Sequence, residues 1–299
     1  PRPKSSAASD VYKRQQLCKT ANQKFLILSF QNNPSEFSKY LRADRVLESQ
    51  GLLTPRILEE NKSLKYLLMD YYPTNNSSKY FKREEIKIIL PKALQNIIHL
   101  QHPRKKFSGI PVKAQTNLMK DALKGIETYI GYFDHKIQIG YYLNRLIQIS
   151  LKKNLKNITK YKPRLAHGDF FLENLIYYKK NIFVIDHQDL HYNHPYLDIA
   201  SLIFDARRQY SPKVEDRCIK EYAKKCNQPL KQTIYDIHLV SLARNLRILG
   251  NWINLYRSGK PQYLKKYRKA TWTQIFKHVE YLRFWDLREL FEEVYKKTK

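Results

Sequence analysis

The strongest structural signal in the chain is the segment Arg164–Arg207. It contains His167–Asp169 (HGD), then Asn174, and then Asp186 at the end of a short apolar run. Between the two later residues, Tyr177–Ile182 combines polar turn-forming residues with flanking apolar ones, which is the pattern of a β-hairpin. We therefore expect a two-stranded hairpin that joins Asn174 to Asp186, with the HGD motif on the loop just before it.

The expected hairpin gives these polar residues a common chemistry. If the turn is centred on Lys180, Asn174 and Asp186 face each other with Cβ atoms about 5 Å apart. An amide oxygen and a carboxylate at that separation can hold a hard divalent cation that carries nucleotide phosphates. Asp169 is then placed to accept a proton from a substrate hydroxyl, which is the division of roles that phosphoryl transfer requires. The alternative is a hairpin with three incidental polar residues, and it leaves the spacing unexplained.

The rest of the chain is organised as strands followed by helices. Apolar runs predict strands around residues 24–30, 56–58 and 65–71, and helical spacing after Pro34 predicts a helix that ends at Gly51. The polar stretch Pro73–Ser78 is the best linker, and we place a lobe boundary there. Further helices are expected over residues 84–99, 114–133, 138–155, 198–208, 213–226, 234–256 and 260–281. Strands first and helices afterwards predict a two-lobed α+β protein.

The beginning of the chain has a different origin in our interpretation. Asp10–Gln15 (DVYKRQ) corresponds to the translation of an adapter used in sequencing libraries, so we interpret residues 1–15 as a non-native segment. The native chain would begin near Gln16, inside a domain whose first strands are missing. We expect a truncated N-lobe over residues 16–72 and a helical C-lobe, with the catalytic loop and hairpin, over residues 73–299.

The net charge of +28 bears on possible partners. One interpretation is an anionic partner, either nucleic acid or a membrane surface. The other is codon bias, since an AT-rich genome produces chains rich in Lys, Asn, Ile, Tyr and Phe. Basic residues are scattered along the chain without an aromatic-basic recognition motif, so we favour codon bias and expect no specific nucleic acid. No apolar run approaches about 18 residues, so no membrane partner is expected. Three cysteines without metal-ligand spacing indicate reduced thiols in a cytoplasmic protein.

The segment Arg164–Arg207 resembles the aminoglycoside phosphotransferase and choline kinase superfamily, which shares the protein-kinase fold. Its stretch IDHQD, followed by HPYLDIASLIFDAR, is most similar to bacterial N-acetylmuramate/N-acetylglucosamine anomeric kinases. A second stretch, SLARNLRILGNWINLYRSGKPQYL (Ser241–Leu264), is similar to a helix and turn of the same kinases. The resemblance implies a protein-kinase-like two-lobed fold, with a small, N-terminally truncated, β-rich N-lobe and a large, mainly helical C-lobe.

The resemblance also implies roles for individual residues. It carries Asp169 over as the catalytic base, and Asn174 and Asp186 as Mg²⁺ ligands. It implies that the adenine-binding hinge is the backbone of three consecutive residues, Met69, Asp70 and Tyr71.

Two polar residues are expected to support the site rather than to react. His167 is expected to anchor the catalytic loop by packing. Asp198 is expected to be the N-cap of a helix, and the resemblance adds a role in bracing the catalytic loop. His187 stands where the related kinases have an aromatic residue, and we expect it to pack.

Other polar residues are candidates for contact with the substrate. Asp189 is the best of these, because it follows the metal ligand on a loop at the mouth of the expected cleft. Asp205 is placed to line the same cleft, and Arg207 is an alternative contact for a sugar or a carboxylate. Arg244 and Asn245 lie in the middle of an expected helix, either as substrate contacts or as a buried polar brace.

Three functions are consistent with these patterns. The first is a monomeric kinase that uses ATP and Mg²⁺ to phosphorylate the anomeric hydroxyl of N-acetylmuramate or N-acetylglucosamine during cell-wall recycling. The second is an aminoglycoside or choline-type kinase, although the charge of +28 would repel a polycation at long range. The third is a non-catalytic basic binding protein, against which the complete set of Asp169, Asn174 and Asp186 argues.

Overall fold

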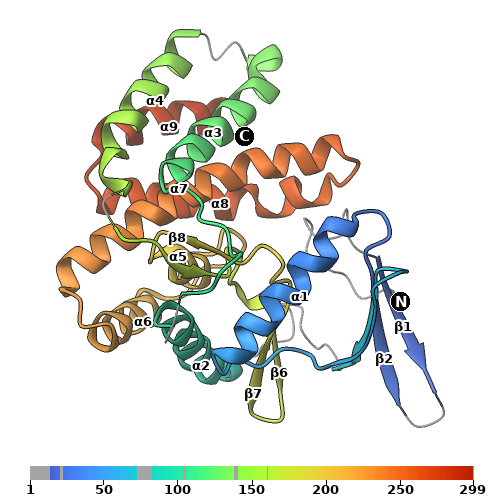
Figure 1. Ribbon diagram of the computed structural model, residues 1–299. Helices are drawn as coiled ribbons and strands as arrows, with labels where there is room; N and C mark the ends of the chain where they lie inside the picture. Colours follow the sequence, from blue (N-terminus) through green and yellow to red (C-terminus); the bar gives the residue numbers. More distant parts are fainter. Residues whose placement is uncertain are drawn as a thin grey trace. The chain divides into compact units, whose positions relative to one another are not determined.

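The computed structural model describes residues 14–20, 23–72, 83–103, 106–137, 141–159 and 161–298. They belong to two compact units. The first unit comprises Pro1–Pro111 and Leu165–Tyr192, and the second comprises Val112–Arg164 and Asn193–Lys299. Figure 1 labels the α-helices and several of the strands. The expected linker Pro73–Ser78 lies outside the described residues, and the lobe boundary placed there stays a prediction.

An antiparallel sheet with the strand order β1-β2-β4-β3 forms the N-terminal part of the first unit. β2 (Lys24–Ser29), β3 (Ile57–Asn61) and β4 (Tyr66–Asp70) confirm the three expected strands. β1 (Arg14–Lys19) was not predicted; it pairs with the whole length of β2 and includes two residues of the segment interpreted as non-native. Side chains of β4 alternate between buried and half-buried, because successive residues of a strand point to opposite faces.

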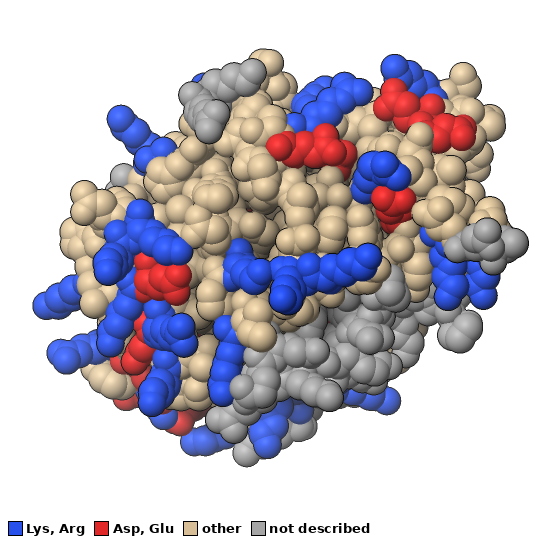
Figure 2. Space-filling model, turned by 90° about the horizontal axis from the view of Figure 1, so that it is seen from below, with Lys and Arg blue, Asp and Glu red and all other residues tan. Residues whose placement is uncertain are grey.

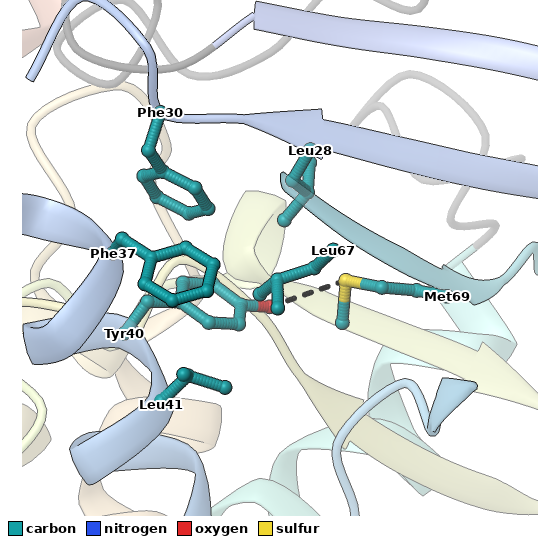
Figure 3. Close-up of a cluster of buried hydrophobic side chains, with 7 residues drawn as sticks. All are labelled: Leu28, Phe30, Phe37, Tyr40, Leu41, Leu67 and Met69. Carbon is teal, nitrogen blue, oxygen red and sulfur yellow. Dashed lines mark hydrogen bonds between the residues drawn. The ribbon is translucent and has the colours of Figure 1, made fainter. Parts of the chain in front are cut away.

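Helix α1 (Pro34–Ser49) covers this sheet with an apolar face. Pro34 suits the first helical position because the N–H that it lacks would have no partner there. The helix contributes Phe37, Tyr40 and Leu41, at helical spacing, to a buried cluster with residues of β2, β4 and the turn after β2. Figure 3 shows this cluster, which consists of Leu28, Phe30, Phe37, Tyr40, Leu41, Leu67 and Met69.

The segment that carries the HGD motif forms two short two-stranded sheets, and the second of them, a hairpin, contacts helix α2 (Arg83–Gln101). β5 (Arg164–Ala166) pairs with β8 (His191–Asn193). β6 (Leu175–Tyr178) and β7 (Asn181–Val184) form the expected hairpin, preceded by the short 3₁₀ helix η3 (Leu172–Asn174). The tip of the hairpin is held to α2, because Lys92 Nζ donates to the carbonyl oxygen of Lys180 at 2.5 Å.

The register of the hairpin differs by one residue from the expected register. Tyr178 pairs with Asn181, so the turn consists of Lys179 and Lys180, whose φ angles are +46° and +66°. Two-residue turns with positive φ match the twist of the flanking strands and are therefore favoured in hairpins. Leu175 pairs with Val184, so continuing the register sets Asn174 beside Ile185. The expectation that Asn174 faces Asp186 directly was wrong, because it assumed a turn centred on a single residue.

The second unit is mainly helical. Its helices are α3 (Thr116–Ile137), α4 (Tyr141–Asn154), η2 (Lys156–Thr159), α5 (Leu197–Ile203), α6 (Pro212–Lys225), α7 (Leu230–Arg257), α8 (Gln262–Tyr281) and α9 (Trp285–Lys297). The expected helices are present, although α5 ends earlier than predicted, and α9 was not predicted. The small antiparallel sheet and the mainly helical remainder confirm the predicted α+β fold class.

Helices α3 and α7 approach each other so closely that their backbones touch. A Cβ atom on Gly125 would lie 2.3 Å from the carbonyl oxygen of Leu246, and one on Gly250 would lie 2.7 Å from Gly125 Cα. Only glycine permits such an approach, because any larger residue would force the helices apart. By contrast, a Cβ atom on Gly131, also in α3, would meet nothing within 4 Å.

Basic side chains are numerous on the surface. On the face shown in Figure 2, lysine and arginine side chains are spread widely, and acidic side chains lie among several of them. This agrees with the scatter of basic residues along the sequence. In the part of the chain that the structure describes, no helix is long and apolar enough to cross a membrane.

Candidate active site

The HGD motif forms a tight loop after β5. Gly168 has a φ angle of +93°, which glycine adopts without the penalty that a side chain would bring. A Cβ atom at this position would also lie 2.8 Å from Cε1 of His191. The ring of His191 is in turn fixed, because its Nδ1 lies 2.6 Å from the carbonyl oxygen of Asp189. The loop that presents Asp169 is therefore packed directly against β8.

His167 links this loop to the end of β7. It is buried, with 1% of its surface exposed. The N–H of Asp169 donates to His167 Nδ1 at 3.3 Å, so the ring hydrogen is on Nε2, which donates to the carbonyl oxygen of Ile185 at 3.1 Å. One imidazole thus connects the residue expected as base to the residue before Asp186. His167 thus joins the two segments, and its role as the anchor of the catalytic loop stays a prediction.

Asn174 makes a second link between the same two segments. Its side-chain Nδ2 donates to the carbonyl oxygen of Asp169 at 2.9 Å, and its own carbonyl oxygen accepts from the N–H of Ile185 at 3.0 Å. Because the amide nitrogen is used in this way, the side chain can offer only its oxygen to a cation. The structure therefore brings Asp169, Asn174 and Asp186 to one end of the hairpin, despite the shifted register.

Asp186 adopts an uncommon backbone conformation just beyond β7. Its φ angle is +64°, a left-handed value that aspartate tolerates better than most residues. Gln188 Nε2 donates to its Oδ1 at 3.1 Å. A carboxylate has about four acceptor positions, so it can accept such a bond and bind a cation at the same time.

The donor set fits a magnesium ion that also binds nucleotide phosphates. Among the described residues, no three His, Cys, Asp or Glu side chains gather as a metal site. Mg²⁺ is usually held by one or two carboxylates together with phosphate oxygens and water, rather than by a cage of protein ligands. An amide oxygen from Asn174 and a carboxylate from Asp186 meet that requirement.

The other candidates in the first unit are Asp189 and the residues of the expected hinge. Asp189 is exposed and follows the metal-binding candidate in a turn, where the N–H of Leu190 donates to the carbonyl oxygen of His187 at 3.0 Å. In the expected hinge, Met69 is buried in the sheet core, whereas Asp70 and Tyr71 at the end of β4 are half-buried. The next residue, Tyr72, packs on the hairpin, with its ring centre 4.3 Å from that of Phe183.

The remaining candidates belong to the second unit. Asp205 is buried and lies just beyond α5, where its Oδ1 accepts from the backbone N–H of Arg207 at 3.1 Å and from its Nη1 at 3.0 Å. The Arg207 guanidinium also lies over the ring of Trp252, 5.2 Å from its centre. Arg244 is buried in the middle of α7. Asp198 is buried in the first turn of α5, but the N-cap is Tyr196, so the capping role expected for Asp198 was wrong.

Three side chains hold the Phe204–Arg208 segment in place. Sequence reasoning missed two of them, Thr271 and Gln274, and left the third, Asn245, open between a substrate contact and a buried polar brace. Three alternate carbonyl oxygens of this segment accept hydrogen bonds from helices α7 and α8. The donors are Asn245 Nδ2 to Phe204 at 3.4 Å, Thr271 Oγ1 to Ala206 at 3.2 Å and Gln274 Nε2 to Arg208 at 3.1 Å. Thr271, Gln274 and His278 recur at helical spacing on an otherwise apolar face of α8. That run of polar residues at core positions was the available signal.

A pair of buried histidines lies beside this segment. His238 Nδ1 and His278 Nδ1 are 3.1 Å apart, and Asn245 Nδ2 donates to His278 Nε2 at 3.3 Å. His278 must therefore carry its hydrogen on Nδ1 and donate it to His238, so both rings are neutral. Burial lowers the pKa of His238 to about 3, with a further contribution from the Lys277 ammonium. Burial, His238 and Lys277 together hold the pKa of His278 well below its ordinary value.

Comparison with known proteins identifies the family. A family model described as the phosphotransferase enzyme family matches residues 5–230, which is more than half of the chain, and the protein belongs to this family. The N-acetylmuramate/N-acetylglucosamine kinase of Caulobacter vibrioides is 33% identical over 106 residues, which are 33% of this chain and 29% of that protein. The match therefore spans less than a third of the length of this relative.

Two solved structures show a similar fold. A choline/ethanolamine kinase family protein from Mesorhizobium loti is 10% identical, with a TM-score of 0.62 over 93% of this chain and 92% of that chain. The ADP-bound aminoglycoside phosphotransferase APH(2'')-Ib is 15% identical, with a TM-score of 0.58 over 88% of this chain and 93% of that chain. At these identities the likeness concerns the fold alone, which is kinase-like. The chain is thus a phosphotransferase with a kinase-like fold, as its sequence motifs predicted.

Proposed function

We propose that this phosphotransferase transfers the γ-phosphoryl group of ATP to the anomeric hydroxyl of N-acetylmuramate or N-acetylglucosamine. The observation that carries phosphoryl transfer is the hydrogen-bonded set of Asp169, Asn174 and Asp186 at the end of the hairpin. The sugar acceptor is supported by the 33% identity to the Caulobacter kinase over 106 residues. The enzyme would act as a monomer in the cytoplasm, on sugars released from the cell wall.

Asn174 and Asp186 are the residues that would hold Mg²⁺. When bound, the ion would bridge the phosphates of ATP and neutralise the charge that develops on the transferred group. Asp186 would supply the anionic contact and Asn174 a neutral one. The hydrogen bond from Gln188 to Asp186 and the one from Asn174 to the Asp169 carbonyl oxygen keep both side chains oriented.

Asp169 would act as the base for the acceptor hydroxyl. Phosphoryl transfer passes through a loose transition state, so the hydroxyl loses its proton late and a carboxylate of modest basicity suffices. An anomeric hydroxyl is more acidic than an ordinary alcohol, which makes this transfer easier. Because His167 and Asn174 both bind the backbone of Asp169, the carboxylate would be held toward the acceptor with little freedom to move.

The remaining candidates are assigned to the two substrates. The backbone of Met69, Asp70 and Tyr71 would bind adenine, and Asp189, Asp205, Arg207 and Arg244 would contact the acceptor. Arg207 is the residue best suited to the carboxylate of N-acetylmuramate, because a guanidinium binds carboxylates in a two-pronged geometry.

An aminoglycoside or choline-type acceptor is the second candidate. The fold likeness to the Mesorhizobium protein and to the ADP-bound aminoglycoside phosphotransferase favours it. The net charge of +28 argues against a polycationic acceptor and favours an anionic sugar, since charges of like sign slow the approach of a substrate.

A panel of acceptors incubated with ATP and Mg²⁺ tests the proposal. We expect turnover of N-acetylmuramate or N-acetylglucosamine, and a phosphorus NMR signal of the product coupled to the anomeric proton. Such a product is also labile to mild acid, whereas a 6-phosphate survives. Coupling to the C6 methylene, or turnover of kanamycin-like amines or choline alone, would reject the anomeric assignment. The Asp169→Asn variant is the control for contaminating kinases.

A further inference from the structure

The residue after the candidate metal ligand is held by helix α1. His187 has 0% of its surface exposed, and its Nε2 lies 3.2 Å from Oδ1 of Asp44. Asp44 lies in the middle of α1 and is itself only 3% exposed. Asp44 Oδ1 and both ring nitrogens of His187 have no hydrogen-bond partner among the residues that the structure describes. Each side chain is therefore the main electrostatic compensation for the other.

A second residue of α1 fixes the orientation of the same imidazole. The Tyr40 ring lies four residues before Asp44, on the same helical face, and its centre is 4.3 Å from that of the His187 ring. Tyr40 is tied to the sheet, because its hydroxyl donates to the sulfur of Met69 at 3.7 Å, as Figure 3 shows. Burial raises the pKa of Tyr40 well above its ordinary value, and the negative charges of Asp44 and Asp186 add to this shift. The negative charge of Asp186 therefore affects the same part of α1 that contacts His187.

These contacts hold the Asp186 backbone from its C-terminal side. On its N-terminal side, Ile185 is held by Asn174 and by His167. Asp186 itself has a φ angle of +64°, which is unfavourable for a residue with a side chain unless its neighbours are fixed. A residue in this conformation, with the residues on both sides tied down, has its carboxylate direction set by its surroundings.

We propose that His187 is a positioning residue, through which Asp44 and Tyr40 of helix α1 hold the Asp186 carboxylate in the direction that a nucleotide-bound magnesium ion needs. This inference rests on the proposed function, because it assumes that Asp186 binds the ion. Partners behind a metal ligand fix its orientation and so determine affinity for the metal. Here the contacts run from the end of the hairpin through His187 to α1, and through Tyr40 of α1 to Met69 in the sheet core. A substitution in α1 is therefore expected to alter metal binding although neither proposed metal ligand is changed.

The test compares two isosteric substitutions in α1, each made in the full 299-residue chain. Asp44→Asn removes the charge that faces His187, and Glu48→Gln makes the same change one turn later at an exposed position of the helix. Binding of ATP is measured by calorimetry in EDTA and over a series of Mg²⁺ concentrations. We expect Asp44→Asn to raise the Mg²⁺ concentration for half-maximal effect by about threefold to tenfold, which is less than the roughly 10–100-fold loss that follows when a group bonded directly to a ligand is removed. ATP binding in EDTA should change less than about twofold, as should every measurement on Glu48→Gln.

A second set of variants keeps the inference testable if Asp44→Asn does not fold. Asp44→Leu combined with His187→Phe replaces the pair by two apolar side chains of similar size, a replacement that buried ion pairs usually tolerate. This double variant should recover most of the Mg²⁺ dependence that His187→Phe alone loses, since it restores contact between α1 and the loop.

The possible failures are distinct. If the parent chain binds ATP with no dependence on Mg²⁺, the proposed function fails, and the inference fails with it. If the parent shows Mg²⁺ dependence and folded Asp44→Asn shows the same dependence, only the positioning role is rejected. It is also rejected if the effects of the Asp44→Leu and His187→Phe changes simply add, or if ATP affinity in EDTA falls as far as affinity in Mg²⁺.

Discussion

Acidification should destabilise the second unit through the histidine pair of α7 and α8. Both rings are neutral in the folded protein, since His278 donates to His238 and accepts from Asn245. A proton added to either ring would set one N–H against another N–H. In the unfolded chain each histidine has a pKa of about 6.5. Between pH 6.5 and the depressed folded values, unfolding therefore takes up protons, and the free energy of unfolding falls as the pH falls.

The size of the effect follows from the pKa difference. Above about pH 6.5 both states hold neutral rings and the pair is insensitive to pH. At about pH 5.5, each histidine lowers the free energy of unfolding by roughly 1–2 kcal/mol relative to its value at high pH, and the two together lower it by about 3 kcal/mol. For His238, the loss continues until the pH approaches its folded pKa of about 3. Besides burial, the positive charge of Lys277 contributes to the low pKa values of both rings.

Urea denaturation of His238→Phe at pH 7.5, 6.5 and 5.5 isolates one ring of the pair. Tryptophan fluorescence reports on the second unit, because the three tryptophans, Trp252, Trp272 and Trp285, all belong to it. The phenylalanine ring keeps the stacking against Tyr281, which has a centre distance of 3.9 Å. We expect the loss of stability between pH 7.5 and 5.5 to be smaller than in the parent by roughly 1–2 kcal/mol.

A control separates this effect from general destabilisation. Val279→Ala removes buried volume beside His278 without removing a titrating group, so it should lower stability equally at every pH. The reasoning is refuted if His238→Phe keeps the full pH dependence of the parent, because the folded protein must then accept a proton on that ring.

Three further predictions concern the proposed centre and the helix packing. Asp169→Asn should reduce turnover by roughly 10²–10⁴-fold while ATP affinity stays unchanged; turnover within a few-fold of the parent would exclude Asp169 as the base. Asp186→Ala should abolish Mg²⁺-dependent binding of ATP in a calorimetric titration, and Asn174→Ala should weaken it less because a neutral ligand attracts the ion less; unchanged affinity in Asp186→Ala would end the metal assignment. Gly125→Ala should lower the free energy of unfolding by about 1–3 kcal/mol or more, whereas Gly131→Ala in the same helix should raise it by about 0.5–1 kcal/mol. Equal effects in urea denaturation would mean that α3 and α7 are not in backbone contact.

Local sequence patterns predicted those parts of the fold that are determined by residues close together in the sequence, such as the hairpin. The hairpin between Asn174 and Asp186 follows from two apolar runs and a polar turn, and the structure confirms it. The structure also brings Asp169 to the same end of the hairpin, because only a few residues separate it from Asn174. The exact register was not predicted, because a turn of one central residue and a turn of two fit the same polar stretch.

Errors arose where a local rule competed with packing elsewhere in the chain. Asp198 has the residue type of an N-cap and precedes an apolar helical face, yet the helix begins one residue earlier, at Leu197. Asp198 is completely buried, and the packing around it, rather than its capping preference, determines its place in the first turn. Helix α5 likewise ends at Ile203, where the carbonyl oxygen of Phe204 accepts a hydrogen bond from Asn245 of α7.

Contacts between segments that are distant in the sequence could not be predicted, and these contacts fix the position of the residues around Asp186. His187 was expected to pack, and its burial agrees with that expectation. Its partner is the Asp44 carboxylate, far away in the sequence, on a helix that the spacing of apolar residues predicted without any role for Asp44. A charged residue at a core position of a helix is costly unless it has a buried partner. The position of Asp44 therefore required a partner without indicating which one. The same requirement applies to Thr271 and Gln274 of α8, whose partners include the carbonyl oxygens of Ala206 and Arg208. A polar residue on an apolar helical face therefore indicates, from sequence alone, that a buried partner exists. Only the fold shows which segment supplies that partner and is held in place by it.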